Sequence, residues 1–287
     1  KFICNCIFAS LTFVISSCHN SETKTDNSVA DAAHLFTLLS TDSTHIDFSN
    51  PLAEGLNTNV LLYEYFYNGG GVAVGDINND GLQDIYFSSN LGDNKLYLNK
   101  GGMQFQDITV AANAQSRPGP WKTGVTIADV NGDGMEDIYV CYSGKLPSFK
   151  RANQLFINQG NAAGAVPTFL EQASQYGLTD TGYATQSFFF DFDRDGDLDM
   201  FLLNHNPNNL PLLDESSTLA ILAKRDDNTG VKLFRNDKNH FVDITSTSGF
   251  SSSALSYGLG AGIADINLDG WPDIYISNDY GVPDYLY

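Results

Sequence analysis

Short apolar runs alternate with acidic turns along most of this chain. Four turns share one nine-residue pattern, namely DINNDGLQD (76–84), DVNGDGMED (129–137), DFDRDGDLD (191–199) and DINLDGWPD (265–273). Each is followed by an apolar run rich in β-branched and aromatic residues: IYFSS (85–89), IYVCY (138–142), MFLLN (200–204) and IYISN (274–278). Because turn and strand signals recur together, we predict a repeat in which each acidic turn leads into a β-strand.

Three further strand signals complete the repeat. A Gly- or aromatic-rich run precedes each turn, at 67–75, 121–128, 182–190 and 257–264. A leucine–aromatic run follows at 95–99, 154–158, 232–236 and 284–287, and a fourth run at 105–109, 169–173 and 241–245. Four short strands per unit are typical of a propeller blade. We therefore predict an all-β fold, a β-propeller of four-stranded antiparallel blades, with four blades present and each acidic turn in the hairpin between first and second strands.

The turns read D-x-[DN]-x-D-G-x-x-D, which supplies oxygen atoms at alternate positions. Side chains at positions 1, 3, 5 and 9 and the carbonyl of position 7 suit a hard cation, and glycine at position 6 permits a sharp turn. The predicted metal ligands are Asp76, Asn78, Asp80, Leu82, Asp84; Asp129, Asn131, Asp133, Met135, Asp137; Asp191, Asp193, Asp195, Asp197, Asp199; and Asp265, Asn267, Asp269, Trp271, Asp273.

An all-oxygen ligand set favours Ca²⁺ over zinc or copper, and over Mg²⁺, which usually retains several waters. We expect about one Ca²⁺ per blade, four sites in all. The ions are expected to hold the blades together and not to take part in catalysis.

The formal net charge of −19 has two interpretations. It describes an acidic soluble surface, or it is cation-binding capacity concentrated in the four turns; the spacing of the aspartates favours the second. No basic stripe is present, so we expect no nucleic-acid partner.

The amino-terminal residues resemble an export signal. Residues 2–16 are apolar but short for a bilayer span, and they end at Ile15-Ser16-Ser17-Cys18, which resembles a bacterial lipobox. We expect a lipoprotein signal peptide at 1–17, lipidation of Cys18 and a flexible tether at 18–50, giving a membrane-anchored lipoprotein on the bacterial outer membrane or cell surface. The alternative is an ordinary secretory signal with an incidental cysteine.

These motifs resemble the FG-GAP/VCBS repeats of integrin α-like propellers. Tyr257-Gly258-Leu259-Gly260-Ala261-Gly262 is close to the Phe-Gly and Gly-Ala elements that name the repeat. YNGGGVAVGDINNDGLQDIYF followed by NKLYLNKGGMQFQDIT is similar to bacterial VCBS-repeat lipoproteins, related to cartilage acidic protein and to ASPIC/UnbV-domain proteins. The resemblance covers about 55–287 and implies a seven-bladed ring, Ca²⁺ in the hairpins and ligands on the opposite face. We therefore expect 51–287 to be a propeller that is incomplete at its carboxyl end, with 59–67 as a possible strand of the closing blade.

The variable loops are the expected ligand contacts. The segment 204–230 of the third unit is much longer than its counterparts, with a short helix expected around 212–225. Such an insertion belongs to a binding face or only shields an edge. Further candidates are 88–94, 115–121 and 142–151. The expected function is a calcium-stabilised surface module for adhesion that recognises an unknown protein or glycan.

Two other functions remain open. Propellers can host hydrolases or lyases that act on polysaccharides, and a structural component of an outer-membrane complex is the third possibility. No nucleophile–base pair is evident, so we expect no enzyme activity. His205 is the one histidine near a conspicuous loop, and a lone histidine there is more often a hydrogen-bonding residue than a catalyst.

Overall fold

A computed structural model describes residues 35–162, 164–209, 211–280 and 282–287. The chain divides into Lys1–Leu39 and a compact unit, Ser40–Tyr287, which is the subject below. The expected signal peptide and Cys18 lie outside the described residues. Within the described part of the chain, no helix has the length and apolar character needed to cross a membrane.

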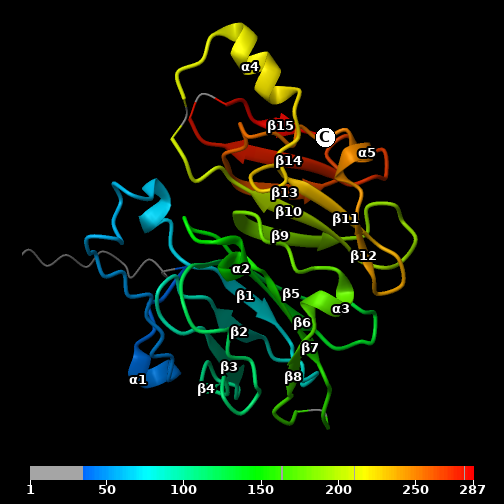
Figure 1. Ribbon diagram of the computed structural model, residues 1–287. Helices are drawn as coiled ribbons and strands as arrows, with labels where there is room; N and C mark the ends of the chain where they lie inside the picture. Colours follow the sequence, from blue (N-terminus) through cyan, green and yellow to red (C-terminus); the bar gives the residue numbers. More distant parts are fainter. Residues whose placement is uncertain (1–34, 163, 210, 281) are drawn as a thin grey trace, which may run out of the picture. The chain divides into compact units, whose positions relative to one another are not determined.

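The compact unit is mostly β and contains four antiparallel sheets, three of four strands and one of three (Figure 1). The first sheet consists of β1 (Val72–Gly75), β2 (Asp84–Phe87), β3 (Lys95–Asn99) and β4 (Phe105–Asp107). The second consists of β5 (Lys122–Ala128), β6 (Asp137–Tyr142), β7 (Gln154–Asn158) and β8 (Phe169–Glu171). The third consists of β9 (Ala184–Phe190), β10 (Asp199–Asn204), β11 (Lys232–Asn236) and β12 (Phe241–Asp243), and the fourth of β13 (Gly258–Ala264), β14 (Asp273–Asn278) and β15 (Tyr285–Leu286). Strands pair in chain order within each sheet, as expected for FG-GAP propeller blades, so the predicted fold class is confirmed.

The helices are short; α1 and η1 precede β1, and the others lie between strands. They are α1 (Thr41–Thr44), the 3₁₀ helix η1 (Glu64–Tyr67), α2 (Ser148–Arg151), α3 (Ala173–Tyr176), α4 (Glu215–Leu222) and α5 (Thr245–Ser248). Helix α4 is the one expected in the long insertion. It begins after Asp214, whose carboxylate accepts the Ser217 N–H at 2.7 Å.

The core lies between neighbouring sheets. Residues of β6 alternate between two clusters: Ile138 and Val140 pack with the first sheet, whereas Tyr139 and Cys141 pack with the third. β10 behaves in the same way, because its even-numbered residues face the second sheet and its odd-numbered residues the fourth. Both faces of β6 and β10 are therefore buried, which explains why these two strands read as nearly continuous apolar runs.

The first strands of successive sheets lie against one another. Thr123 Oγ1 donates to the Ala184 carbonyl at 2.7 Å, and Thr185 Oγ1 donates to the Gly258 carbonyl at 3.3 Å. Gly124 permits this close approach, because a Cβ there would lie 2.5 Å from the carbonyl oxygen of Thr185. The small residues of the expected first strands thus bring neighbouring sheets together along their inner edges.

Two segments differ from the sequence-based expectations. Residues 59–67 form turns and η1 instead of a strand, since the Asn59 side chain accepts the Leu61 N–H at 3.0 Å and starts a turn. In the expected tether, Asp47 accepts the Tyr97 hydroxyl at 2.6 Å and Phe48 stacks on Phe87 with ring centroids 4.7 Å apart. The compact unit therefore begins at Ser40, before the expected start of the propeller at 51.

A buried ion pair between Lys232 and Asp180 offers a test of the fold. Both side chains are less than a tenth exposed. Replacing Lys232 with Met would leave the Asp180 carboxylate buried without its partner, so we expect the free energy of unfolding to fall by about 3–5 kcal/mol in urea denaturation. The double variant Lys232→Met with Asp180→Asn should lose clearly less. If the free energy of unfolding of the single variant falls by less than about 1 kcal/mol, the ion pair does not stabilise the fold as predicted.

Candidate functional site

The four acidic loops share one internal geometry. In each, the carboxylate at position 1 accepts the backbone N–H groups of positions 5 and 6. For Asp76 these donors are Asp80 at 3.0 Å and Gly81 at 2.7 Å; Asp129, Asp191 and Asp265 accept in the same way. The position-6 glycines all have φ between 83° and 99°, as the sequence predicted. These contacts fold each loop back upon its own carboxylates.

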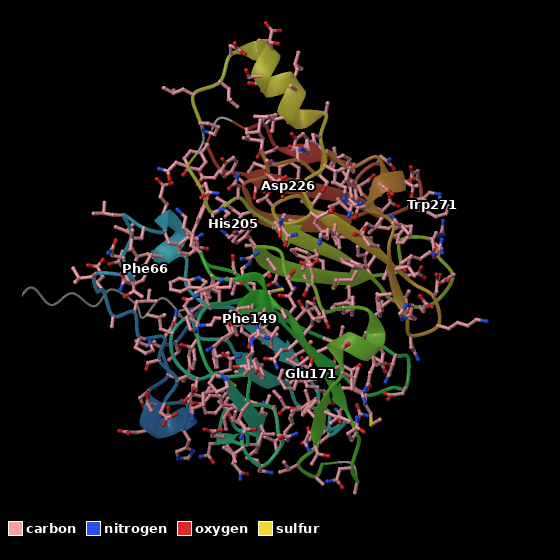
Figure 2. All side chains as sticks on the ribbon, viewed as in Figure 1. Phe66, Phe149, Glu171, His205, Asp226 and Trp271 are labelled. Atoms are coloured by element: carbon pink, nitrogen blue, oxygen red, sulfur yellow. The ribbon has the colours of Figure 1, made fainter. Side chains whose placement is uncertain are left out.

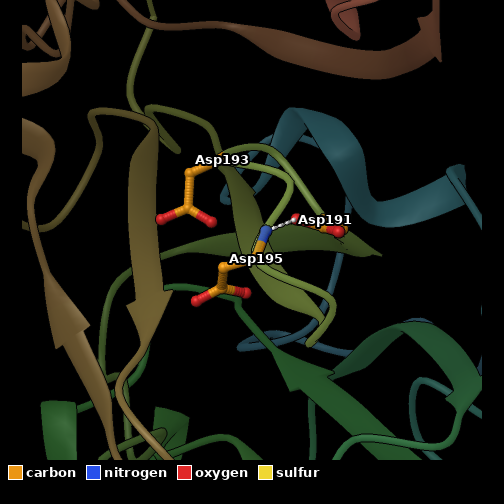
Figure 3. Close-up of side chains that lie close together, drawn as sticks. All are labelled: Asp191, Asp193 and Asp195. Carbon is orange, nitrogen blue, oxygen red and sulfur yellow. Dashed lines mark hydrogen bonds between the residues drawn. The ribbon is translucent and has the colours of Figure 1, made fainter.

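The third loop contains the largest number of carboxylates, five in nine residues. Oxygen atoms of Asp191, Asp193 and Asp195 all lie within 4.8 Å of one another (Figure 3). In the other loops, position 3 is Asn, whose amide donates to the position-5 carboxylate at 3.0 Å. Asp193 cannot donate in this way, and buried oxygen atoms of Asp193 and Asp197 have no hydrogen-bond partner. Clustered carboxylate oxygens without donors fit a divalent cation such as Ca²⁺.

Position 9 has a different environment from positions 1, 3 and 5. Asp84, Asp137 and Asp199 are fully buried, and each carboxylate accepts two backbone N–H groups. For Asp137, Val130 donates at 3.0 Å from inside the loop and Asn158 donates at 2.8 Å from the end of β7. Asp84 and Asp199 make the equivalent pairs with the ends of β3 and β11. This residue therefore joins the acidic loop to the third strand; its predicted role as a metal ligand stays a prediction.

Burial makes ionisation of these carboxyl groups costly. It raises the pKa of Asp84 to about 6, that of Asp137 to about 7 and that of Asp199 to about 6. The accepted N–H groups lower each pKa, whereas neighbouring loop carboxylates raise it further: those at positions 1 and 5 for Asp84 and Asp137, and Asp193 and Asp197 for Asp199. A cation in the loop would offset that repulsion.

Sequence reasoning missed two features of the loops. Asn99, Asn158 and Asn236 end the third strands, and their side-chain amides donate to the carbonyl of loop position 8 at 2.9–3.1 Å. The signal was present, because an asparagine closes KLYLN, QLFIN and KLFRN. Position 4 adopts a left-handed conformation even where it is Asn79, Arg194 or Leu268, and nothing in the pattern marks that position.

A second site lies where the second strands end, away from the acidic loops. Asn90, Ser143, His205 and Asp279 stand at the same offset from the last loop aspartate of their sheets. The Tyr63 hydroxyl meets His205 Nε2 at 3.1 Å, and the Tyr65 hydroxyl donates to Asp279 at 3.2 Å. The segment 59–67 is thus held across the ends of the third and fourth sheets by its tyrosines.

Of these residues, Tyr63, Tyr65, His205 and Asp279 line a cavity of about 560 Å³ that also reaches first-strand residues of the later sheets. Its wall includes Tyr63, Tyr65, Trp121, His205 and Asp279. Figure 2 places Phe66 and His205 toward one side of the compact unit and Trp271, in the fourth acidic loop, toward the opposite side. Of the loops expected to bind a ligand, 115–121 contributes Trp121 and 204–230 contributes His205.

His205 is buried and hydrogen-bonded on both ring nitrogens, since its Nδ1 lies 3.0 Å from Thr185 Oγ1. Burial lowers its pKa to about 4, so the imidazole is neutral near pH 7. The structure thus agrees with the hydrogen-bonding role expected for this residue.

Comparison with known sequences identifies the class of repeat. A family model for the FG-GAP-like repeat matches residues 76–140, which contain the first two acidic loops. The chain is also related in sequence to cartilage acidic protein 1: it is 27% identical to that of Xenopus tropicalis over 81% of this chain and 31% of the relative. It is 33% identical to that of Homo sapiens over 47% of this chain and 20% of the relative. The chain thus spans less than a third of the length of these relatives.

The two roles assigned within a loop can be separated by mutation. Asp137→Ala would leave the Val130 and Asn158 N–H groups without acceptors, so we expect a loss of about 3 kcal/mol in the free energy of unfolding even in EDTA. Asp133→Ala in the same loop is the matched control: its side chain is exposed, and in EDTA the loss should stay below about 1 kcal/mol. If urea titrations show equal losses in the free energy of unfolding for the two variants, Asp137 does not have the strand-linking role assigned to it.

His205 should contribute to acid sensitivity. Its pKa is lower in the folded protein than in the unfolded chain, so the unfolded state binds the proton more tightly and stability falls as the pH drops from about 6.5 to 4. The advantage of the wild type over His205→Gln should therefore shrink by about 3 kcal/mol across that interval. Comparing the two proteins cancels the opposite contributions of the loop carboxyls. A constant difference between their urea unfolding curves across this pH range would refute the prediction.

Proposed function

We propose that this chain is part of a calcium-stabilised binding module that displays its ligand site on the face away from the acidic loops. The observation that carries the proposal is the separation of two kinds of site. Carboxylates and turn N–H groups fill the loops, whereas aromatic and polar side chains line a cavity near the opposite ends of the second strands.

In this proposal each of the four loops holds one Ca²⁺. The third loop supports it most directly, through its Asp191–Asp193–Asp195 triad. The other loops repeat its backbone geometry with Asn at position 3, which also offers an oxygen ligand. The residues that would hold each ion are those at positions 1, 3 and 5, with the position-7 carbonyl and the position-9 carboxylate completing the set.

The bound ions supply cohesion and not chemistry. Each would neutralise several carboxylates within a hairpin that is joined to the third strand through position 9, so binding favours the folded blade. The aspartates whose pKa burial raises toward neutrality, Asp84, Asp137 and Asp199, belong to these hairpins. Their perturbation is therefore accounted for without a catalytic role, and we propose a module that is not an enzyme.

The ligand is a protein or a glycan, and the location is a cell surface. The export-signal pattern at residues 1–17 and Cys18 support a lipid-anchored protein of the bacterial outer membrane. The sequence relation to cartilage acidic protein 1 supports a repeat domain within a larger protein.

Calcium removal tests the proposal. At Ca²⁺ one hundred times its dissociation constant, a single site adds about 2.7 kcal/mol. We therefore expect EDTA to lower the melting temperature by roughly 5 °C or more, and excess Ca²⁺ to restore it, whereas Mg²⁺ restores it less. Scanning calorimetry measures the change, and an unaltered melting curve would exclude calcium as a stabiliser.

Asp195→Ala should remove one of these ions. Hydrogen exchange in Ca²⁺ should accelerate mainly in β9 and β10, because the other sheets keep their own ions. Asp42→Ala, an exposed change in α1, should leave exchange unaltered. Uniform acceleration over all four sheets would contradict one independent ion per blade.

A further inference from the structure

The cavity at the ends of the second strands combines aromatic rings with unbalanced negative charge. Tyr63, Tyr65 and Trp121 contribute aromatic surface, and Glu64 and Asp279 contribute carboxylates. Among the described residues that line it, none is a lysine or an arginine. Such a cavity repels anions, and its charge is complementary to that of a cationic ligand.

The aromatic wall is held in place before any ligand arrives. Tyr63 meets Trp121 edge to face with ring centroids 5.3 Å apart, and Tyr65 meets the His205 ring at 4.7 Å. The Tyr65 hydroxyl also orients the Asp279 carboxylate, which accepts the Tyr280 N–H at 2.6 Å on its other oxygen. Because these side chains are already held in place, few of them lose conformational freedom when a ligand binds, and this favours affinity.

His205 does not provide the missing charge. Both of its ring nitrogens are already engaged, one with Tyr63 and one with Thr185, and the side chain is only 4% exposed. Glu64 is exposed at the rim, where Asn209 Nδ2 donates to one carboxylate oxygen at 2.5 Å and the Tyr280 hydroxyl donates to the other; both donors are neutral. The negative charge of the cavity is therefore left for a ligand.

An apolar groove adjoins the cavity. It has a volume of about 350 Å³ and shares Tyr63 and Trp121 with the cavity as a common wall. Leu62, Phe66, Pro120 and Leu146 give it apolar surface, and its lining also includes Asn57, Thr58, Asn59 and Lys145. The two hollows lie side by side. A ligand that fills both presents a cationic group next to an apolar group, which neighbouring side chains of a polypeptide provide.

We propose that this face binds a polypeptide by inserting a lysine or arginine side chain into the cavity and an adjacent apolar side chain into the groove. The ammonium or guanidinium group meets the faces of the aromatic rings and the Glu64 and Asp279 carboxylates, a combination that recognises organic cations. The inference rests on the proposed binding function and narrows its ligand from a protein or glycan to a basic segment of a protein.

Trp121 provides the readout. In a Trp271→Phe background it is the single tryptophan, since the chain has two. We expect its fluorescence to titrate to saturation with the capped dipeptide N-acetyl-Arg-Leu methylamide. The citrulline analogue, which has the same shape without the charge, should bind at least about tenfold more weakly. N-acetyl-Arg-Ser methylamide should bind more weakly than the leucine peptide if the groove takes part.

Matched variants locate the interaction. Asp279→Asn and Glu64→Gln preserve shape and should each weaken the arginine peptide severalfold or more while leaving the citrulline peptide unaffected. Asp42→Asn, an equivalent change on exposed α1, should have no effect. Circular dichroism confirms that each variant is folded before titration.

Several outcomes would overturn the inference. Equal binding of the arginine and citrulline peptides would remove the role of charge. Saturation by a neutral oligosaccharide alone would show a glycan site, and binding of spermidine without the peptides would show a free-amine site. All titrations are made in Ca²⁺ on protein whose melting curve has first been measured with and without EDTA. Failure of the peptide is thereby distinguished from failure of the calcium-stabilised fold.

Discussion

The buried aspartate at the end of each of the first three acidic loops is the contact on which the corresponding sheets depend. Its carboxylate accepts one N–H from the start of its own loop and one from the last residue of the third strand. One side chain therefore fixes the hairpin between the first two strands and joins it to the third. Because both acceptor oxygens are used in a buried place, removal leaves two backbone donors without partners.

This arrangement brings several carboxylates close together. Positions 1, 3 and 5 lie in the same turn as position 9, and the repulsion among them adds to the cost of ionising the buried group. A divalent cation relieves that repulsion and gains oxygen ligands in the same step. The proposed calcium binding and the observed linkage between strands thus involve the same aspartates and act together. The first strands take no part in that linkage, and those of the later sheets line the cavity.

Much of this fold can be predicted from the sequence, because its signals are local. The acidic pattern locates the turns, and its glycine marks a position with positive φ. The short apolar runs between the turns mark the strands. The helix in the long insertion also follows from local sequence, with Asp214 at its start. The structure of segment 59–67 could not be predicted in this way, although its apolar and aromatic residues suit a strand. Asn59 and contacts with His205 and Asp279, which are distant in sequence, fix a turn and a 3₁₀ helix instead. The cavity could not be foreseen for the same reason, since its walls come from the second, third and fourth sheets, from η1 and from residues 68–71 before β1.

The position of calcium in the loops tests this account most directly. A crystal of the protein grown in Ca²⁺, measured with X-rays at a wavelength where calcium scatters anomalously, locates each ion without assumptions about its ligands. The account predicts an anomalous peak among the oxygens of positions 1, 3 and 5 in each of the four loops. Peaks confined to the third loop, or absent from all four, would contradict it.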